Sequence, residues 1–108
     1  MALTTNMQTQ AAGITNRATG SVVTDAGAAA DTTFTLGFTP TTVRFHNVTD
    51  RISDEWIIGM AAYSSIHTVA AGTRTLEVTN GISVGTGNFT VKAATILASK
   101  SFSWEAVG

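Results

Sequence analysis

The chain has no cysteine among its 108 residues. Disulfide bonds and thiolate metal sites are therefore excluded, and stability has to come from burial within the chain or against partner chains. Charge is also scarce, because only 12% of the residues are charged, whereas an average soluble domain has roughly 25%. So little charge indicates that other protein covers part of the surface, although a coat of Thr and Ser would also keep a monomer in solution.

Basic runs and long apolar runs are missing as well. The formal net charge is −1 and no cluster of Lys or Arg occurs, so nothing in the sequence predicts nucleic-acid binding. No apolar stretch is long enough to span a bilayer, so no membrane partner is expected. The first residues lack the basic segment and apolar core of a secretory signal, which predicts assembly in the cytoplasm.

The length fits one domain. Residues 1–13 are small, polar and without an apolar period; they predict an N-terminal arm that is flexible alone and either orders against a neighbour or simply frays. Residues 14–108 are rich in Thr, Val, Ile and aromatic residues, which suit a pleated, half-buried surface, and they predict a single β domain.

Apolar and polar residues alternate in many short runs, which is the pattern of half-buried strands. Val43 and Phe45 oppose Arg44 and His46, for example. We expect strands near residues 15–23, 32–38, 41–48, 54–60, 65–70, 73–79, 88–97 and 100–107. The predicted fold is all-β: an antiparallel β-sandwich of about eight strands, of jelly-roll or related Greek-key type.

Turn residues separate these runs. Asn80-Gly81 predicts a tight hairpin, because both residues tolerate positive φ. It would connect the strand that contains Leu76 and Val78 to a short strand that contains Ile82. The stretch Gly85–Asn88 lacks the spacing of a phosphate-binding loop and is more simply a hairpin turn.

Residues that could carry chemistry are few. His46 and His67 are the only histidines, and they are too isolated to predict a metal site. Asp50, Asp54 and Glu55 cluster beside Arg51; we favour a solvated turn or interface ion pairs there over an acid/base pair for glycoside hydrolysis. No nucleophile motif is present. The sequence therefore predicts no enzyme activity, no catalytic residue, no metal and no cofactor.

Aromatic residues leave one alternative open. Trp56 and Trp104 fall on the apolar sides of their runs, so we expect them in the core. If these two or Tyr63 were instead exposed on one face, the chain would be a carbohydrate-binding β-sandwich module.

Five short motifs stand in the central part of the chain: Gly37–Pro40, Val43–Arg51, Glu55–Trp56, Gly59–Met60 and Thr68–Arg74. With these motifs the chain resembles small virion structural proteins of tailed bacteriophages. The resemblance covers residues 37 to 74 best.

This resemblance implies a capsid decoration (cement) protein, in which a compact β-sandwich binds the outer capsid and stabilises capsomer contacts. It implies a homo-oligomer, with a trimer favoured, whose partner is the major capsid protein or another virion protein. The chain would reside in the virion after assembly in the host cytoplasm. A tail, fibre or baseplate component is the alternative. The residues expected to make assembly contacts are Thr4, Asn6, Gln8, Gln10, Asp50, Arg51, Asp54 and Glu55.

Overall fold

A computed structural model describes residues 16–108 of the chain. The predicted arm at 1–13 lies outside the described residues, and with it the expected contacts Thr4, Asn6, Gln8 and Gln10. None of the described residues forms a helix long and apolar enough to cross a membrane. The described chain forms eight strands: β1 (Arg17–Val23), β2 (Thr32–Thr35), β3 (Thr42–Asn47), β4 (Ile52–Ile57), β5 (Ser64–Thr68), β6 (Arg74–Gly85), β7 (Asn88–Val91) and β8 (Ser101–Val107).

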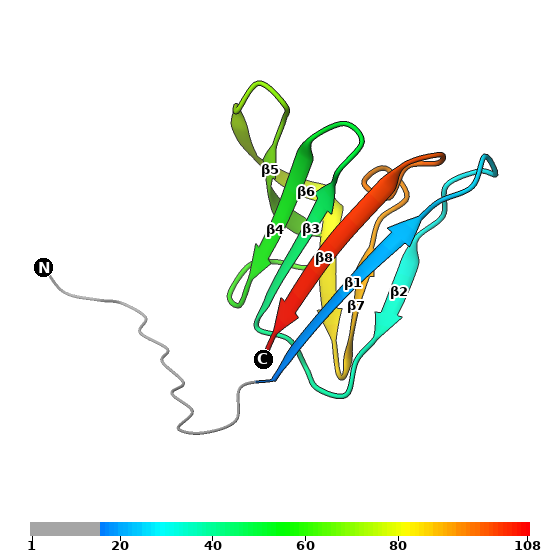
Figure 1. Cartoon of the computed structure of the whole chain (residues 1–108). Coiled ribbons are helices and arrows are strands. Elements are labelled where there is room, and N and C mark those ends of the chain that lie inside the picture. The colour runs from blue at the N-terminus through cyan, green and yellow to red at the C-terminus, as the bar shows by residue number, and fades with distance from the viewer. Residues whose placement is uncertain (1–15) are drawn as a thin grey trace, which may run out of the picture.

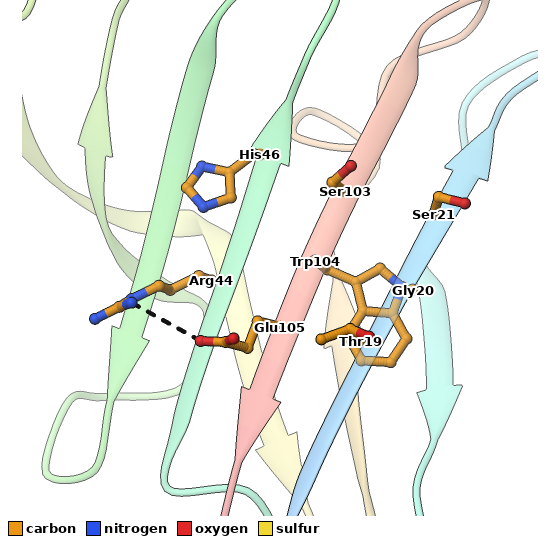
Figure 2. A pocket seen from close by; sticks show the side chains of 8 residues that line it. All are labelled: Thr19, Gly20, Ser21, Arg44, His46, Ser103, Trp104 and Glu105. Carbon is orange, nitrogen blue, oxygen red and sulfur yellow. Dashed lines mark ion pairs between the residues drawn. The ribbon is translucent and has the colours of Figure 1, made fainter.

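All eight strands belong to one sheet, in the order β1-β8-β3-β4-β5-β6-β7-β2. Every neighbouring pair is antiparallel. Figure 1 shows the sheet curling on itself, with β7 and β2 behind β8 and β1; Figure 2 shows β1, β8 and β3 side by side. The all-β prediction is confirmed. The two-sheet sandwich is corrected to a single half-barrel sheet, because β6 joins the two layers without a break.

The bend in β6 explains this correction. The first half of β6 pairs with β5, and the second half pairs with β7. Between these halves, residues 78–81 lie outside the ladder, because Ser65 is opposite Glu77 whereas Ser64 is opposite Ile82. The carboxylate of Glu77 holds this segment by accepting hydrogen bonds from the backbone N–H groups of Thr79 (3.3 Å) and Asn80 (3.0 Å).

The predicted hairpin at Asn80-Gly81 is therefore wrong. Gly81 serves close approach instead: a Cβ atom placed on it would lie 2.6 Å from the carbonyl carbon of Ser64. The hairpin comes at the end of β6, where Gly85 is opposite Asn88. Gly87 has a φ of 73° there, which confirms the turn expected at this stretch and which glycine adopts without strain.

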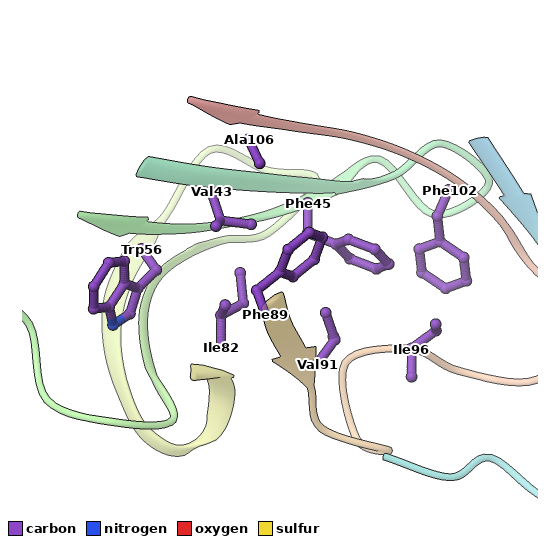
Figure 3. Close-up of a cluster of buried hydrophobic side chains, with 9 residues drawn as sticks. All are labelled: Val43, Phe45, Trp56, Ile82, Phe89, Val91, Ile96, Phe102 and Ala106. Atoms are coloured by element: carbon purple, nitrogen blue, oxygen red, sulfur yellow. The ribbon is translucent and has the colours of Figure 1, made fainter. Parts of the chain in front are cut away.

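The core fills the inside of the curled sheet. Figure 3 shows the side chains of Phe45 on β3 and Phe102 on β8 pointing to the same inner side, with Phe89 of β7 rising toward Phe45 from below. The Phe45 and Phe102 rings stack with centroids 5.1 Å apart, and all three side chains are at most 1% exposed. The alternation of apolar and polar residues thus predicted the inner side of these strands correctly. The buried cluster consists of Val43, Phe45, Trp56, Ile82, Phe89, Val91, Ile96, Phe102 and Ala106.

Candidate functional site

The side of the sheet that faces away from the core, called the outer face below, is formed by β1, β8, β3, β4, β5 and the first half of β6. In an antiparallel ladder, residues directly opposite each other point to the same side. Arg44 on β3 is therefore aligned with Glu105 on β8 and with Glu55 on β4. Two residues further along β3, His46 is aligned with Ser53, and its Nδ1 lies 2.9 Å from the Ser53 hydroxyl.

Four charged side chains form a chain of ion pairs across the outer face. The Nε of Arg17 donates to Glu105 Oε2 (2.9 Å). Arg44 lies between two carboxylates, with Nε 2.8 Å from Glu55 Oε2 and Nη1 3.8 Å from Glu105 Oε1. The hydrogen bond from Arg17, together with the positive charge of Arg44, holds the pKa of Glu105 below its ordinary value. The two arginines and two glutamates of this chain of ion pairs carry no net charge between them, and Arg74 at the start of β6 adds an exposed positive charge to the same face.

Two open pockets lie on this face and share Arg44 and His46. The larger has a volume of about 600 Å³ and extends over β1, β8 and β3 (Figure 2). The smaller has a volume of about 340 Å³ and extends over β3, β4, β5 and the start of β6. Thr and Ser hydroxyls line much of both. Together they form a shallow groove of mixed polar and apolar lining rather than an enclosed site.

Next to this groove the outer face becomes apolar. Ile66 on β5 is directly opposite Leu76 on β6. Val78 follows Leu76 by two residues, and Ile57 follows Glu55 by two residues on β4. Leu76 is 66% exposed and Val78 is 60% exposed. We call Ile57, Ile66, Leu76 and Val78 the apolar patch. Exposed apolar groups that gather beside polar ones are typical of protein-interaction surfaces.

The structure separates the predicted assembly contacts. Asp50 and Arg51 lie in the turn after β3, where Asp50 accepts hydrogen bonds from Asn47 Nδ2 (3.0 Å) and Lys100 Nζ (3.1 Å). Glu55 lies on the outer face and pairs with Arg44, as described above. Asp54 is only 3% exposed. It alternates with Glu55 along β4 and so points inward; the solvated turn expected here ends before it, and Asp54 cannot be a surface contact in this fold.

Asp54 is the centre of a small buried polar cluster. Its Oδ1 accepts a hydrogen bond from Ser65 Oγ (2.7 Å) and lies 2.9 Å from His67 Nδ1. A serine, a histidine and an aspartate thus meet, but in an order unsuited to nucleophilic catalysis. In a catalytic triad the histidine lies between the other two, whereas here the carboxylate does. Ser65 is fully buried, and the adjoining cavity is only about 30 Å³. This cluster therefore satisfies polar groups inside the fold.

The two histidines lie on opposite sides of the sheet, His46 on the outer face and His67 on the inner side. They cannot share a metal ion. Among residues 16–108, no three metal-ligating side chains come together.

The tryptophans do not form a sugar-stacking platform on the outer face. Trp56 is 8% exposed. Trp104 points inward, and its ring packs against Phe34 (5.6 Å between centroids) and Phe89 (5.2 Å). The ring of Tyr63 is covered by Lys92, whose Nζ lies 4.3 Å from the ring centroid. The expected core position of Trp56 is confirmed, and Trp104 is packed against the core with part of its surface exposed.

The sequence patterns missed the apolar patch. The alternation along β6 correctly separated Leu76 and Val78 from Thr75 and Glu77, but it did not show which pair faces the core. One signal was available in the sequence: Ile57 directly follows Trp56, so if Trp56 faces the core, Ile57 is an apolar residue on the other side of the strand.

Comparison of the chain with protein-family models, with curated proteins and with solved structures finds no match.

Proposed function

We propose that this chain is a structural protein of a bacteriophage virion, most specifically a capsid decoration protein whose apolar patch binds the major capsid protein. The observation that carries the proposal is the patch itself: Leu76 and Val78 are exposed on β6 beside the half-buried Ile66 of β5, close to the ion pair of Arg44 with Glu55. Such a surface has the apolar centre and polar rim of a protein interface. The resemblance of residues 37–74 to phage structural proteins supplies the kind of partner.

The topology supports this proposal further. The pairing of β1 with β8 and of β2 with β7 is nested, as in a jelly roll, an architecture used by viral capsid proteins. The scarcity of charge also suits a surface that neighbours cover.

The proposed mechanism is passive. A protein that binds only the assembled capsid stabilises that state by mass action, because its binding free energy is lost when the capsid comes apart. Burying one leucine contributes about 1.5–3 kcal/mol. Many copies on one particle would therefore resist its disruption without any covalent chemistry.

The test uses heads of the encoding phage that have been depleted of this chain. Purified chain is added back, the bound copies per head are measured by gel densitometry, and the heat resistance of the particle is recorded. We expect Leu76→Gln to weaken binding by about tenfold or more while the melting temperature of the free chain stays unchanged.

Val48→Gln is the matched control. Val48 is 55% exposed, but it lies in the turn after β3, away from the apolar patch. This variant should bind and protect like the unchanged chain. Equal binding by Leu76→Gln would contradict the assignment of the patch. Finding the chain on tails rather than heads would replace the decoration function with that of a tail, fibre or baseplate component.

A further inference from the structure

The edge of the sheet formed by β1 carries backbone hydrogen-bonding groups that no other described strand uses. Next to the ends of β1, the N–H of Thr24 donates to Lys100 O (2.9 Å), and Asn16 O accepts from the N–H of Gly108 (2.9 Å). In an antiparallel ladder such bonds involve every second residue. The even-numbered residues of β1 therefore face β8. The N–H and C=O groups of Arg17, Thr19, Ser21 and Val23 point away from it, and no other described strand pairs with them.

Nothing in β1 blocks this edge. Natural proteins protect edge strands with short length, Pro, Lys or bulges. The other edge strand, β2, is short, with four residues. β1 has seven residues, all in unbroken register with β8, and it contains no Pro or Lys. Its only charged residue is Arg17, at its first position.

We propose that β1 pairs in antiparallel fashion with β1 of a second copy of this chain, around a two-fold axis at Gly20. In this register Thr19 is opposite Ser21 of the second copy, and Ala18 is opposite Val22. Each contact occurs twice. Opposed hydroxyls and opposed small apolar side chains are both favourable cross-strand pairs. The proposal does not depend on which particle the chain belongs to.

The hydrogen-bonding pattern agrees with this register. With Gly20 opposite itself, each odd-numbered residue meets an odd-numbered residue of the second copy. These are the residues whose backbone groups point outward, so both partners can exchange both bonds. Gly20 then forms a pair without hydrogen bonds at the axis. A register shifted by one residue would oppose outward-pointing groups with inward-pointing ones and would lose these bonds.

Charge and burial favour the same arrangement. The two Arg17 side chains would lie at opposite ends of the paired strands, each opposite Val23, so like charges do not meet. Val23 is 80% exposed in the single chain and would gain contact with the aliphatic part of Arg17. Ala18 and Val22 are half-buried on the inner side, and each would be covered further by the other.

Trp104 determines which residue can stand at the proposed axis. The ring of Trp104 lies beneath Gly20, so closely that a Cβ atom on Gly20 would be 2.5 Å from its Nε1. A glycine here lets β1 lie flat over the ring. The larger pocket, on β1, β8 and β3, would then continue into the same pocket of the second copy. A two-fold contact alone builds a dimer, rather than the trimer implied by the resemblance to phage proteins.

The register predicts the effect of paired charges. Thr19 and Ser21 are exposed on the outer face, so substituting them should leave the fold intact. In the double variant Thr19→Lys/Ser21→Lys, the two introduced lysines oppose each other across the axis, twice. Thr19→Lys/Ser21→Glu instead opposes a lysine and a glutamate, twice. We expect the first variant to raise the dimer dissociation constant by roughly tenfold or more, and the second to keep it within about threefold of the unchanged chain.

Light scattering after size-exclusion chromatography over a range of concentrations measures this for the full-length chain. The control is Thr33→Lys/Thr35→Lys, which adds the same charges to exposed positions of the other edge strand, β2, and should dimerise normally. Circular dichroism melting confirms that each variant is folded. A monomer at all concentrations, or equal dissociation of both Thr19/Ser21 variants, would overturn the proposal. Dissociation of the β2 control would indicate that β1 pairs with β2 of a neighbour in a ring.

Cross-linking provides a second measurement that reads the register directly. The chain has no cysteine, so introduced thiols have no competitors. A mixture of Thr19→Cys and Ser21→Cys proteins should form disulfide-linked dimers, because the two positions are opposed. Each protein alone should cross-link several-fold more slowly. Equal rates for the mixture and for the separate proteins would exclude this register.

Discussion

The two sides of this sheet are built from the same alternating strands, but their apolar side chains differ in burial. On the inner side, Phe45 and Phe89 are fully packed. On the outer face, Leu76 is as apolar but 66% exposed. The difference arises from the curl of the sheet, which closes the inner side over itself and leaves the outer face open. Apolar residues inside are buried by this chain alone, whereas those outside would be buried only by the partner that we propose.

The largest test of this comparison removes an aromatic ring from the inner side. Phe45→Ala deletes a ring that stacks on Phe102 and contacts Phe34 (5.9 Å between centroids). We expect a loss of about 3–5 kcal/mol in the free energy of unfolding, because both burial and packing are lost. Urea denaturation followed by tryptophan fluorescence measures it.

The matched change on the outer face is Leu76→Ala. It should alter the free energy of unfolding of the free chain by about 0.5 kcal/mol or less, as exposed positions usually do. If both substitutions were equally destabilising, Leu76 would be part of a core in solution, and the distinction between the two sides would fail.

The next test addresses the bend that lets the inner side close. Gly81→Ala places a Cβ atom 2.6 Å from the backbone of Ser64, so the strands must move apart. We expect a loss of about 1–3 kcal/mol. Gly37→Ala is the control, since a Cβ atom there has nothing within 4 Å. Thermal melting compares the two variants. Equal melting temperatures would show that the bend can accommodate a Cβ atom at position 81 without cost.

A third test concerns the polar residue on the apolar side. Asp54→Ala removes the acceptor shared by Ser65 and His67 and leaves two donors unsatisfied. We expect a loss of about 1–3 kcal/mol. Asp54→Asn keeps an oxygen in place and should lose less. Chemical denaturation distinguishes them, and an Ala variant as stable as the Asn variant would mean that water replaces the carboxylate.

Much of the fold follows from local pattern. The period of two placed strands close to all eight observed ones, because strands of a half-buried sheet have one buried side, as Phe45 shows on β3, Phe89 on β7 and Phe102 on β8. What the pattern could not give is which strands pair over long distances. The continuity of β6 depends on Gly81 fitting against Ser64, and that contact exists only after β5 and β6 have met.

The candidate site was less predictable. Asp54 and Glu55 are neighbours in a charged stretch, yet one is buried and the other lies beside Arg44. Composition does not distinguish the two carboxylates. Strand alternation shows that they point to opposite sides of the sheet once β4 is known to begin at Ile52. The edge position of β1 could not be predicted from the sequence either, since it depends on β1 pairing with β8 at the far end of the chain.

The smallest expected effect concerns two partly exposed carboxylates, Glu105 on the outer face and Glu77 on the other side of β6. The pKa of Glu105 is lowered mainly by the hydrogen bond from Arg17, whereas that of Glu77 is lowered mainly by the backbone N–H of Asn80. A carboxylate whose pKa is lowered in the folded state stabilises the fold at pH values above the pKa of the unfolded chain, about 4.5. This contribution is lost as the pH falls through the pKa of the folded chain.

Glu105→Gln and Glu77→Gln should each reduce the fall in melting temperature between pH 6 and pH 3. Added salt should diminish the effect of Glu105→Gln more, because an exposed ion pair is screened while a local backbone hydrogen bond is less so. Melting curves at low and high salt measure the difference. An equal salt response would mean that Arg17 does not hold Glu105 in solution, and the chain of ion pairs would then begin at Arg44.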